Sequence, residues 1–152
     1  PILLAAAGYF RVKPKWLGKA SLGTGPFAGL LKGLGCIPID RSAGQDVVRT
    51  VRDVFRAHDR MVLGLAPEGT RSLTPEWKSG FYHIACAAGV PIIIGVIDYR
   101  TRTVSLPEVF HPTGDYAADL VRIQNHYRDA IGKNPDQSHC GTGAFPAGPD
   151  AT

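Results

Sequence analysis

The sequence predicts an α/β fold, in which a mixed, largely parallel sheet of about five to seven strands is flanked by helices. Two observations predict it. Short apolar runs of strand length alternate along the chain with segments whose apolar residues recur at the helical period. Glycine and proline separate these segments, as is typical of the connections between strands and helices. The length of 152 residues suits one domain, which we place at 1–132.

The first 39 residues predict a helix, a strand, a second helix and a second strand. Pro1 stands at the first position of the first helix, where a proline costs no hydrogen bond. Gly35 ends the second helix. The predicted ranges are 1–10 for the first helix, 15–21 for the first strand, 26–34 for the second helix and 36–39 for the second strand.

A longer amphipathic helix and an apolar strand follow. Ser42 and Gln45 have the spacing of a capping box, which marks the beginning of a helix. The next residues place an apolar stripe along one face at the helical period. The stripe consists of Val47, Val48, Val51, Val54, Phe55 and His58. The run 61–66 is apolar throughout, which predicts a strand covered on both sides.

The remaining elements are a helix, more strands and a last helix. After a polar loop at 67–77, we expect a helix at 79–88 that Gly89 ends. We then expect a buried strand at 90–97, a weaker strand pair near the sheet edge at 101–110, and a helix at 115–131. Residues 133–152 are rich in Gly, Pro and Ala and show no period, so we expect a disordered tail.

Composition limits the kinds of partner. The net charge of +4 and the pI of about 9.2 suit an anionic partner: a phosphate, a coenzyme, a nucleic acid or an acidic membrane surface. The three cysteines show no Cys-x-x-Cys spacing, so neither a disulfide framework nor a zinc site is expected. We expect Cys36 and Cys86 to pack as small hydrophobes. No apolar run is long enough to cross a bilayer.

Three segments carry the residues of a predicted anion site. They are Gly35–Arg41 and Ala66–Ser72, which each follow a predicted strand, and Trp77–Gly80 at the mouth of a helix. Strand ends of an open α/β sheet are where ligands bind. Several groups in these segments suit phosphate: guanidinium forks, an ammonium, hydroxyls, and a glycine that allows close approach to the backbone. One carboxylate can organise the cations. The residues are Arg41, Glu68, Gly69, Thr70, Arg71, Ser72 and Lys78. The alternative is a surface loop with ordinary, weak salt bridges.

These segments resemble the glycerolipid acyltransferase family, which contains the 1-acyl-glycerol-3-phosphate acyltransferases. Gly35–Arg41 is similar to the second motif block of that family, Pro67–Ser72 to the third, and Val90–Ile93 to the fourth. Lys19 and Lys78 fall where the family usually has lysines. The resemblance extends from about residue 1 to residue 131 and implies a glycerol-phosphate acyltransferase-like fold. It also implies transfer of a fatty acyl group from acyl-CoA or acyl carrier protein to a hydroxyl of a phosphate-bearing glycerolipid, as in phospholipid synthesis.

The first block of the family, His-x-x-x-x-Asp, has no counterpart here. In the mechanism that the resemblance implies, its His takes the proton of the acceptor hydroxyl and its Asp orients the His. No histidine of the chain has an aspartate five positions later; the five are His58, His83, His111, His126 and His139. We therefore expect the chain to begin just beyond this block, to contain no catalytic residue and to be inactive alone. We expect His83 to face solvent and His58 to sit at a helix end that favours positive charge.

The resemblance leaves the partners as expectations. The co-substrate would be an acyl thioester, and no bound cofactor or metal is expected. Membrane contact would be peripheral, through basic residues and exposed Trp16 or Trp77, at the cytoplasmic face or in the cytoplasm. The second hypothesis is a non-catalytic module that binds anions or lipids. The third is a nucleic-acid binder, which we do not favour because aromatic and basic residues are not interleaved.

Overall fold

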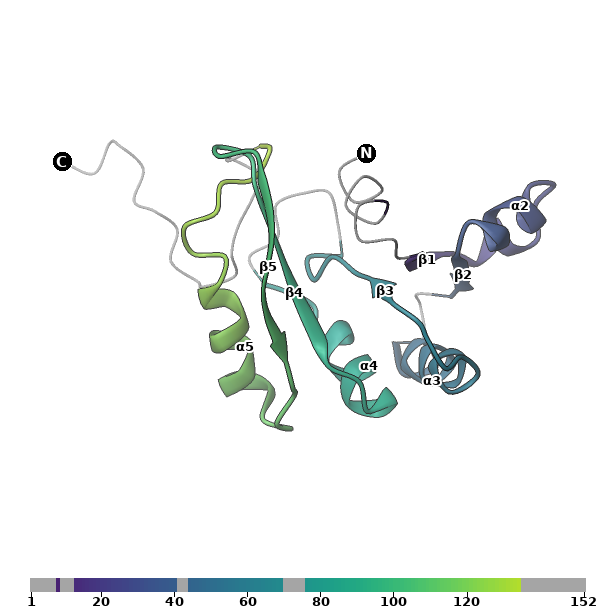
Figure 1. Ribbon diagram of the computed structural model, residues 1–152. Helices are drawn as coiled ribbons and strands as arrows, with labels where there is room; N and C mark the ends of the chain where they lie inside the picture. The colour runs from purple at the N-terminus through teal and green to yellow at the C-terminus, as the bar shows by residue number, and fades with distance from the viewer. Residues whose placement is uncertain (1–7, 9–12, 41–43, 70–75, 135–152) are drawn as a thin grey trace. The chain divides into compact units, whose positions relative to one another are not determined.

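The computed structural model describes residues 8, 13–40, 44–69 and 76–134 (Figure 1). The chain forms two compact units. Unit 1 is Pro1–Ala66 with Gly80–Val90, and unit 2 is Pro67–Ser79 with Pro91–Thr152. The expectation of one domain over 1–132 with a tail over 133–152 stays a prediction.

Unit 1 contains a parallel sheet in the order β2-β1-β3. Its strands are β1 (Lys15–Lys19), β2 (Cys36–Ile39) and β3 (Leu63–Gly64). In the register of β1 and β2, Trp16 lies opposite Cys36 and Lys19 opposite Ile39. Helices interrupt these strands along the chain, so the α/β class and the parallel sheet that the sequence predicts are confirmed.

The helices of unit 1 are η1 (Ala20–Gly23), α2 (Ala28–Gly33), α3 (Gly44–Arg56) and α4 (Gly80–Ala88). Asp46 in the first turn of α3 and Arg56 in its last turn each suit the helix dipole. α3 packs against α4. The packed side chains include Val51 of α3, which has no exposed surface, and Tyr82 and Ile84 of α4. This apolar contact is what stabilises the two amphipathic helices.

Three details of unit 1 differ from the sequence prediction. The predicted strand at 15–21 ends at Lys19, because the chain turns into η1 at Ala20. The apolar run 61–66 gives only the two residues of β3, and Val62 and Leu65 are exposed. β3 is an edge strand bonded to β1 in the described sheet, and the exposure of Val62 and Leu65 shows that the run is not covered on both faces. Cys86 is exposed rather than packed, whereas Cys36 is buried as predicted.

Unit 2 is built on an antiparallel hairpin of β4 (Ile92–Asp98) and β5 (Thr103–Phe110), followed by α5 (Tyr116–Asn125). The weaker strand pair predicted at 101–110 is therefore one strand. The predicted buried strand at 90–97 alternates instead: Ile93 is 51% exposed and Ile94 is 1% exposed. A half-covered antiparallel strand shows this alternation. Among the described residues the five strands thus form two sheets, not the single larger sheet we expected.

α5 begins with a capped first turn and packs against β5. The carboxylate of Asp115 accepts a hydrogen bond from the backbone N–H of Ala118, the usual N-cap arrangement. The guanidinium of Arg122 stacks over the ring of Phe110 at 4.9 Å, and His126 Nε2 lies 2.8 Å from Glu108 Oε2. No helix among the described residues is long and apolar enough to span a bilayer.

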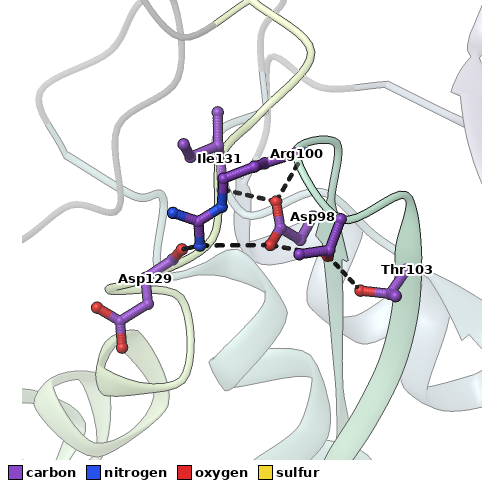
Figure 2. A network of polar contacts seen from close by, with 6 residues as sticks. Asp98, Arg100, Thr103, Asp129 and Ile131 are labelled. Carbon is purple, nitrogen blue, oxygen red and sulfur yellow. Dashed lines mark hydrogen bonds and ion pairs between the residues drawn. The ribbon is translucent and has the colours of Figure 1, made fainter.

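The segment after α5 leaves the helix because the β4–β5 turn holds it (Figure 2). Asp98 accepts hydrogen bonds from the N–H groups of Arg100 and Ile131, at 2.9 and 3.4 Å, and from the hydroxyl of Thr101 at 2.9 Å. The backbone N–H of Tyr99 donates to the carbonyl of Ile131 at 2.8 Å. The helix predicted at 115–131 therefore ends at Asn125, since Ile131 has exchanged helical bonds for bonds to the hairpin.

Candidate functional site

In unit 1, charged residues stand where the two parallel strands β1 and β2 end. Lys19 is the last residue of β1 and is exposed. It lies opposite Ile39 in the sheet, and Asp40, also exposed, directly follows β2. The carboxyl ends of these neighbouring strands thus meet at one edge of the sheet, where the sequence predicted an anion site. Arg41 lies outside the described residues.

After Lys19 the chain turns into η1, and glycines at two positions let β1 and η1 lie close to β2. Gly18 is buried on β1, and a side chain there would overlap the Sγ atom of Cys36 on β2. A Cβ at Gly23, the end of η1, would lie 2.8 Å from the Cβ of Pro38. The backbone of β1 and η1 can therefore lie close against β2 only because both positions lack a side chain. This packing places Lys19 at the corner between strand and turn.

In unit 2, a backbone hydrogen bond closes the loop that begins at Pro67. The N–H of Lys78 donates to the carbonyl of Pro67 at 2.9 Å. The preceding residue, Trp77, is 8% exposed, and its ring meets that of Tyr127 edge to face, with 5.2 Å between centroids. Such a contact is a favourable arrangement of two aromatic rings. Trp77 is thus a buried anchor, and Lys78 beside it is exposed.

Lys78 extends across the backbone at Gly69. A Cβ built on Gly69 would lie 2.9 Å from Cδ, 3.4 Å from Cε and 3.6 Å from Nζ of Lys78. Gly69 has φ +65°, a backbone conformation that residues other than glycine rarely adopt. Glu68, next to it, is half-buried. The structure therefore brings together Gly69 and Lys78, as the sequence predicted, while Thr70, Arg71 and Ser72 lie outside the described residues.

This arrangement can hold an anion. The ammonium of Lys78 carries three hydrogen-bond donors, and the glycine beneath it leaves room for the lysine side chain to lie against the backbone. Elsewhere in the same unit, burial together with the negative charge of Glu76 raises the pKa of Tyr116. Among the described residues, no group of three or more His, Cys, Asp or Glu side chains could hold a metal.

His58 makes local contacts within unit 1. Its ring contacts the carbonyl of Val54 through Nδ1 at 2.8 Å and the ammonium of Lys15 through Nε2 at 3.1 Å. The carbonyl can only accept a hydrogen bond and the ammonium can only donate one, so this pair of contacts fits the tautomer with the hydrogen on Nδ1. His83 is exposed, as predicted.

No sequence pattern indicated the pair formed by Glu108 and His126. These residues stand 18 positions apart, on a strand and just after a helix. Their contact depends on how α5 packs on β5. The guanidinium of Arg122 lies 3.9 Å from the other carboxylate oxygen of Glu108. Glu108 and His126 thus form a part-buried polar contact between the hairpin and the end of α5.

Comparison with known protein families shows the family to which the chain belongs. A family model described as Acyltransferase matches residues 1–97. The chain belongs to the acyltransferase family. The matched range takes in Lys19, Arg41, Glu68–Ser72 and Lys78, and it ends within β4. No curated protein and no solved structure matches the chain. As an acyltransferase, the chain has an acyl donor and an acyl acceptor as its general substrates.

Proposed function

We propose that this acyltransferase domain serves the transfer of a fatty acyl group to a hydroxyl of a phosphate-bearing glycerolipid such as lysophosphatidic acid. The donor is an acyl thioester of coenzyme A or acyl carrier protein. The observation that carries the proposal is Lys78 extended across Gly69, because the missing Cβ lets the lysine lie against the backbone and sets its ammonium beside the Glu-Gly-Thr-Arg segment. An ammonium held in this way is a suitable partner for a phosphate group.

Cations of each unit serve the anionic groups of the acceptor or the donor. Lys78 supplies one ammonium, and Arg71, in the same loop of the sequence, supplies a planar fork. Lys19 and Arg41, at the ends of β1 and β2, supply two further cations for the acceptor or the donor. Thr70 and Ser72 add hydroxyl donors, and Glu68 organises the cations. The family match over 1–97 and the exposure of Lys19 and Lys78 support these roles.

The chemical step needs a base. The hydroxyl oxygen of the acceptor attacks the thioester carbonyl, the new C–O bond forms, and the C–S bond breaks with release of the thiol. The hydroxyl proton must be accepted as the oxygen attacks, and a positioned histidine is the usual acceptor. The 152 residues contain no His-x-x-x-x-Asp sequence. We therefore expect the 152-residue chain to bind substrates and to release no thiol.

Binding and turnover test the proposal separately. Binding is measured by calorimetry with a short-chain lysophosphatidic acid below its micelle concentration, and with the matching monoacylglycerol, which lacks the phosphate. Lys78→Gln should weaken lysophosphatidic acid binding about tenfold, equal to roughly 1.4 kcal/mol, and leave monoacylglycerol binding unchanged. Lys133→Gln, which removes another exposed lysine of unit 2, is the control. Equal affinity for both ligands contradicts the proposed phosphate site.

Turnover distinguishes an enzyme from a binding module. Thiol release from acyl-CoA is followed with lysophosphatidic acid as acceptor, first for the 152-residue chain and then for a chain extended by the reading frame before Pro1. Release by the extended chain, and its loss when an upstream His-x-x-x-x-Asp histidine is changed to Ala, supports the enzyme. Phosphate-dependent binding with no thiol release by either chain supports the non-catalytic lipid-binding module instead.

A further inference from the structure

The segment of unit 1 formed by η1 and α2 exposes large apolar side chains. Phe27 is 68% exposed, and Leu30 and Leu34 are each 63% exposed. Leu22 of η1 and Trp16 of β1, at 38% and 36%, are exposed as well. We call these five residues the α2 patch. Monomeric proteins expose single apolar side chains freely, but a cluster of this kind marks a surface that meets another apolar phase.

Three members of the α2 patch lie on one helical face. The N–H of Leu31 donates to the carbonyl of Phe27 at 3.0 Å, and the N–H of Leu34 donates to that of Leu30 at 3.0 Å. Helical hydrogen bonding therefore runs from Phe27 to Leu34, past both ends of α2. Positions i, i+3 and i+7 of a helix share a face. Phe27, Leu30 and Leu34 thus form one continuous apolar ridge.

Trp16 borders this ridge at its C-terminal end. Its indole N–H donates to the carbonyl of Leu34 at 3.2 Å, although the two residues stand 18 positions apart. The bond satisfies the polar atom of the indole and holds the half-exposed ring beside the helix end. Tryptophan, with one polar atom on a large apolar ring, is enriched where protein meets the membrane–water interface.

The segment that carries the α2 patch has charges of a single sign. Residues 13–34 contain four lysines and no aspartate or glutamate, and the rest of the chain has thirteen basic and thirteen acidic residues. The net charge of +4 therefore equals the charge of this segment. Lys13, Lys19 and Lys32 are exposed, whereas Lys15 contacts His58. An apolar ridge on a segment whose charged residues are all lysines is complementary to a surface that is apolar beneath a negatively charged layer.

We propose that the α2 patch is the surface by which the chain docks on an anionic phospholipid bilayer. The exposed aliphatic residues of the β4–β5 hairpin and α5, such as Val109 and Val121, are a less suitable docking surface because acidic and basic residues are balanced outside 13–34. The proposal rests on the proposed function only in that a glycerolipid acceptor resides in such a bilayer. Docking brings Lys19, at the end of β1 directly before η1, toward the lipid headgroups.

Sedimentation with vesicles tests this docking without any acceptor. The chain is mixed with vesicles of phosphatidylcholine alone and with vesicles containing phosphatidylglycerol, neither of which contains lysophosphatidic acid. We expect at least tenfold tighter binding to the anionic vesicles, and a decline as salt concentration rises. Failure of acceptor binding leaves this result unchanged, so the two proposals fail independently.

Substitutions assign the binding to the α2 patch. Leu30→Ser with Leu34→Ser should lower the affinity for anionic vesicles at least tenfold while the melting temperature stays within a few degrees of the unchanged chain. Val109→Ser with Val121→Ser is the matched control, since these valines are 55% and 60% exposed on unit 2, and it should bind as the unchanged chain does. Lys32→Glu should weaken binding, and Lys133→Glu, at an exposed lysine outside 13–34, should weaken it less.

Three results overturn the proposal. Equal binding by the Leu30→Ser, Leu34→Ser variant and the control excludes the α2 patch as the docking surface. A large fall in melting temperature for that variant shows that another segment of the chain covers the ridge. A dimer in analytical ultracentrifugation that the same variant dissociates shows that a second copy is the partner.

Discussion

The side chain of Lys78 crosses the backbone of Gly69 so closely that a methyl group on Gly69 would come within 2.9 Å of its Cδ. The position also has φ +65°. Two separate constraints thus require glycine there: the backbone conformation and the room that the lysine occupies. The glycine of this Glu-Gly segment therefore shapes the course of the cation that we propose to hold phosphate.

Gly69→Ala tests this relationship. The positive φ alone should destabilise the fold by roughly 1–2 kcal/mol. Gly89→Ala is a matched control, because Gly89 has φ +66° and no atom within 4 Å of its added Cβ. Chemical denaturation should show a loss of stability in both variants. Only Gly69→Ala should also weaken lysophosphatidic acid binding, since only there must Lys78 move. Equal ligand binding by the two variants would show that the position of Lys78 is immaterial.

The sequence predicted the local features of this site and not its distant supports. Glycine beside charged residues after an apolar run is a local pattern, so Gly69 and Lys78 were identified from the residues themselves, whereas Lys19 was named only through the resemblance to the family. Trp77 is held by Tyr127, fifty positions later, and Asp98 by Ile131, 33 positions later. Such contacts depend on the packing of whole elements and leave no spacing to recognise. An apolar run such as 61–66 likewise does not reveal whether both faces of the strand will be covered.

Gly18→Ala tests the close approach of β1 to β2. The added Cβ would overlap Cys36 Sγ and lie 3.3 Å from atoms of Leu22 and Trp16, so overpacking should cost about 1–3 kcal/mol in the free energy of unfolding. Adding Cys36→Ala removes the sulfur and should restore part of that loss. Gly29→Ala, where the new Cβ meets open space on α2, is the control and should not lower the stability, because alanine favours a helix over glycine. Additive effects of Gly18→Ala and Cys36→Ala would argue against this contact.

Asp98 makes the stability of unit 2 sensitive to acid. Partial desolvation raises the pKa of Asp98, but hydrogen bonds from the Thr101 hydroxyl and the N–H groups of Arg100 and Ile131 outweigh it, so the pKa lies below its ordinary value. A lowered carboxyl pKa in the folded state stabilises the fold above the ordinary aspartate range, and the stabilisation is lost as pH falls through the folded pKa.

Asp98→Asn and Asp98→Ala separate charge from hydrogen bonding. At neutral pH the melting temperature should fall from the unchanged chain to Asn to Ala, since Asn keeps one oxygen acceptor and Ala keeps none. The acid-dependent loss of stability should be smaller in both variants. Asp129→Asn is the control, because the side chain of Asp129 is exposed and Arg100 contacts this residue through its backbone carbonyl, which the substitution keeps. An acid transition unchanged by Asp98→Asn would assign the dependence to other groups.

Tyr127 should make unit 2 sensitive to alkali as well. Burial raises the pKa of Tyr127 above its ordinary value of 10.0, and a hydrogen bond from the backbone of Gly95 opposes the rise without cancelling it. A raised pKa means that the folded state favours the neutral phenol. The stabilisation is thus complete below the ordinary pKa and is lost as pH rises through the folded value.

Tyr127→Phe removes the hydroxyl and its hydrogen bond, which should cost about 1 kcal/mol of folding free energy near neutral pH. The variant should also flatten the loss of stability above about pH 10. Denaturation across that range, with Tyr99→Phe as the control at an exposed tyrosine, measures both effects. The edge-to-face contact with Trp77 persists in Tyr127→Phe, so Lys78 should keep its place and lysophosphatidic acid should bind as before. Weaker binding by this variant would mean that the hydroxyl of Tyr127, and not its ring, positions the loop that carries Lys78.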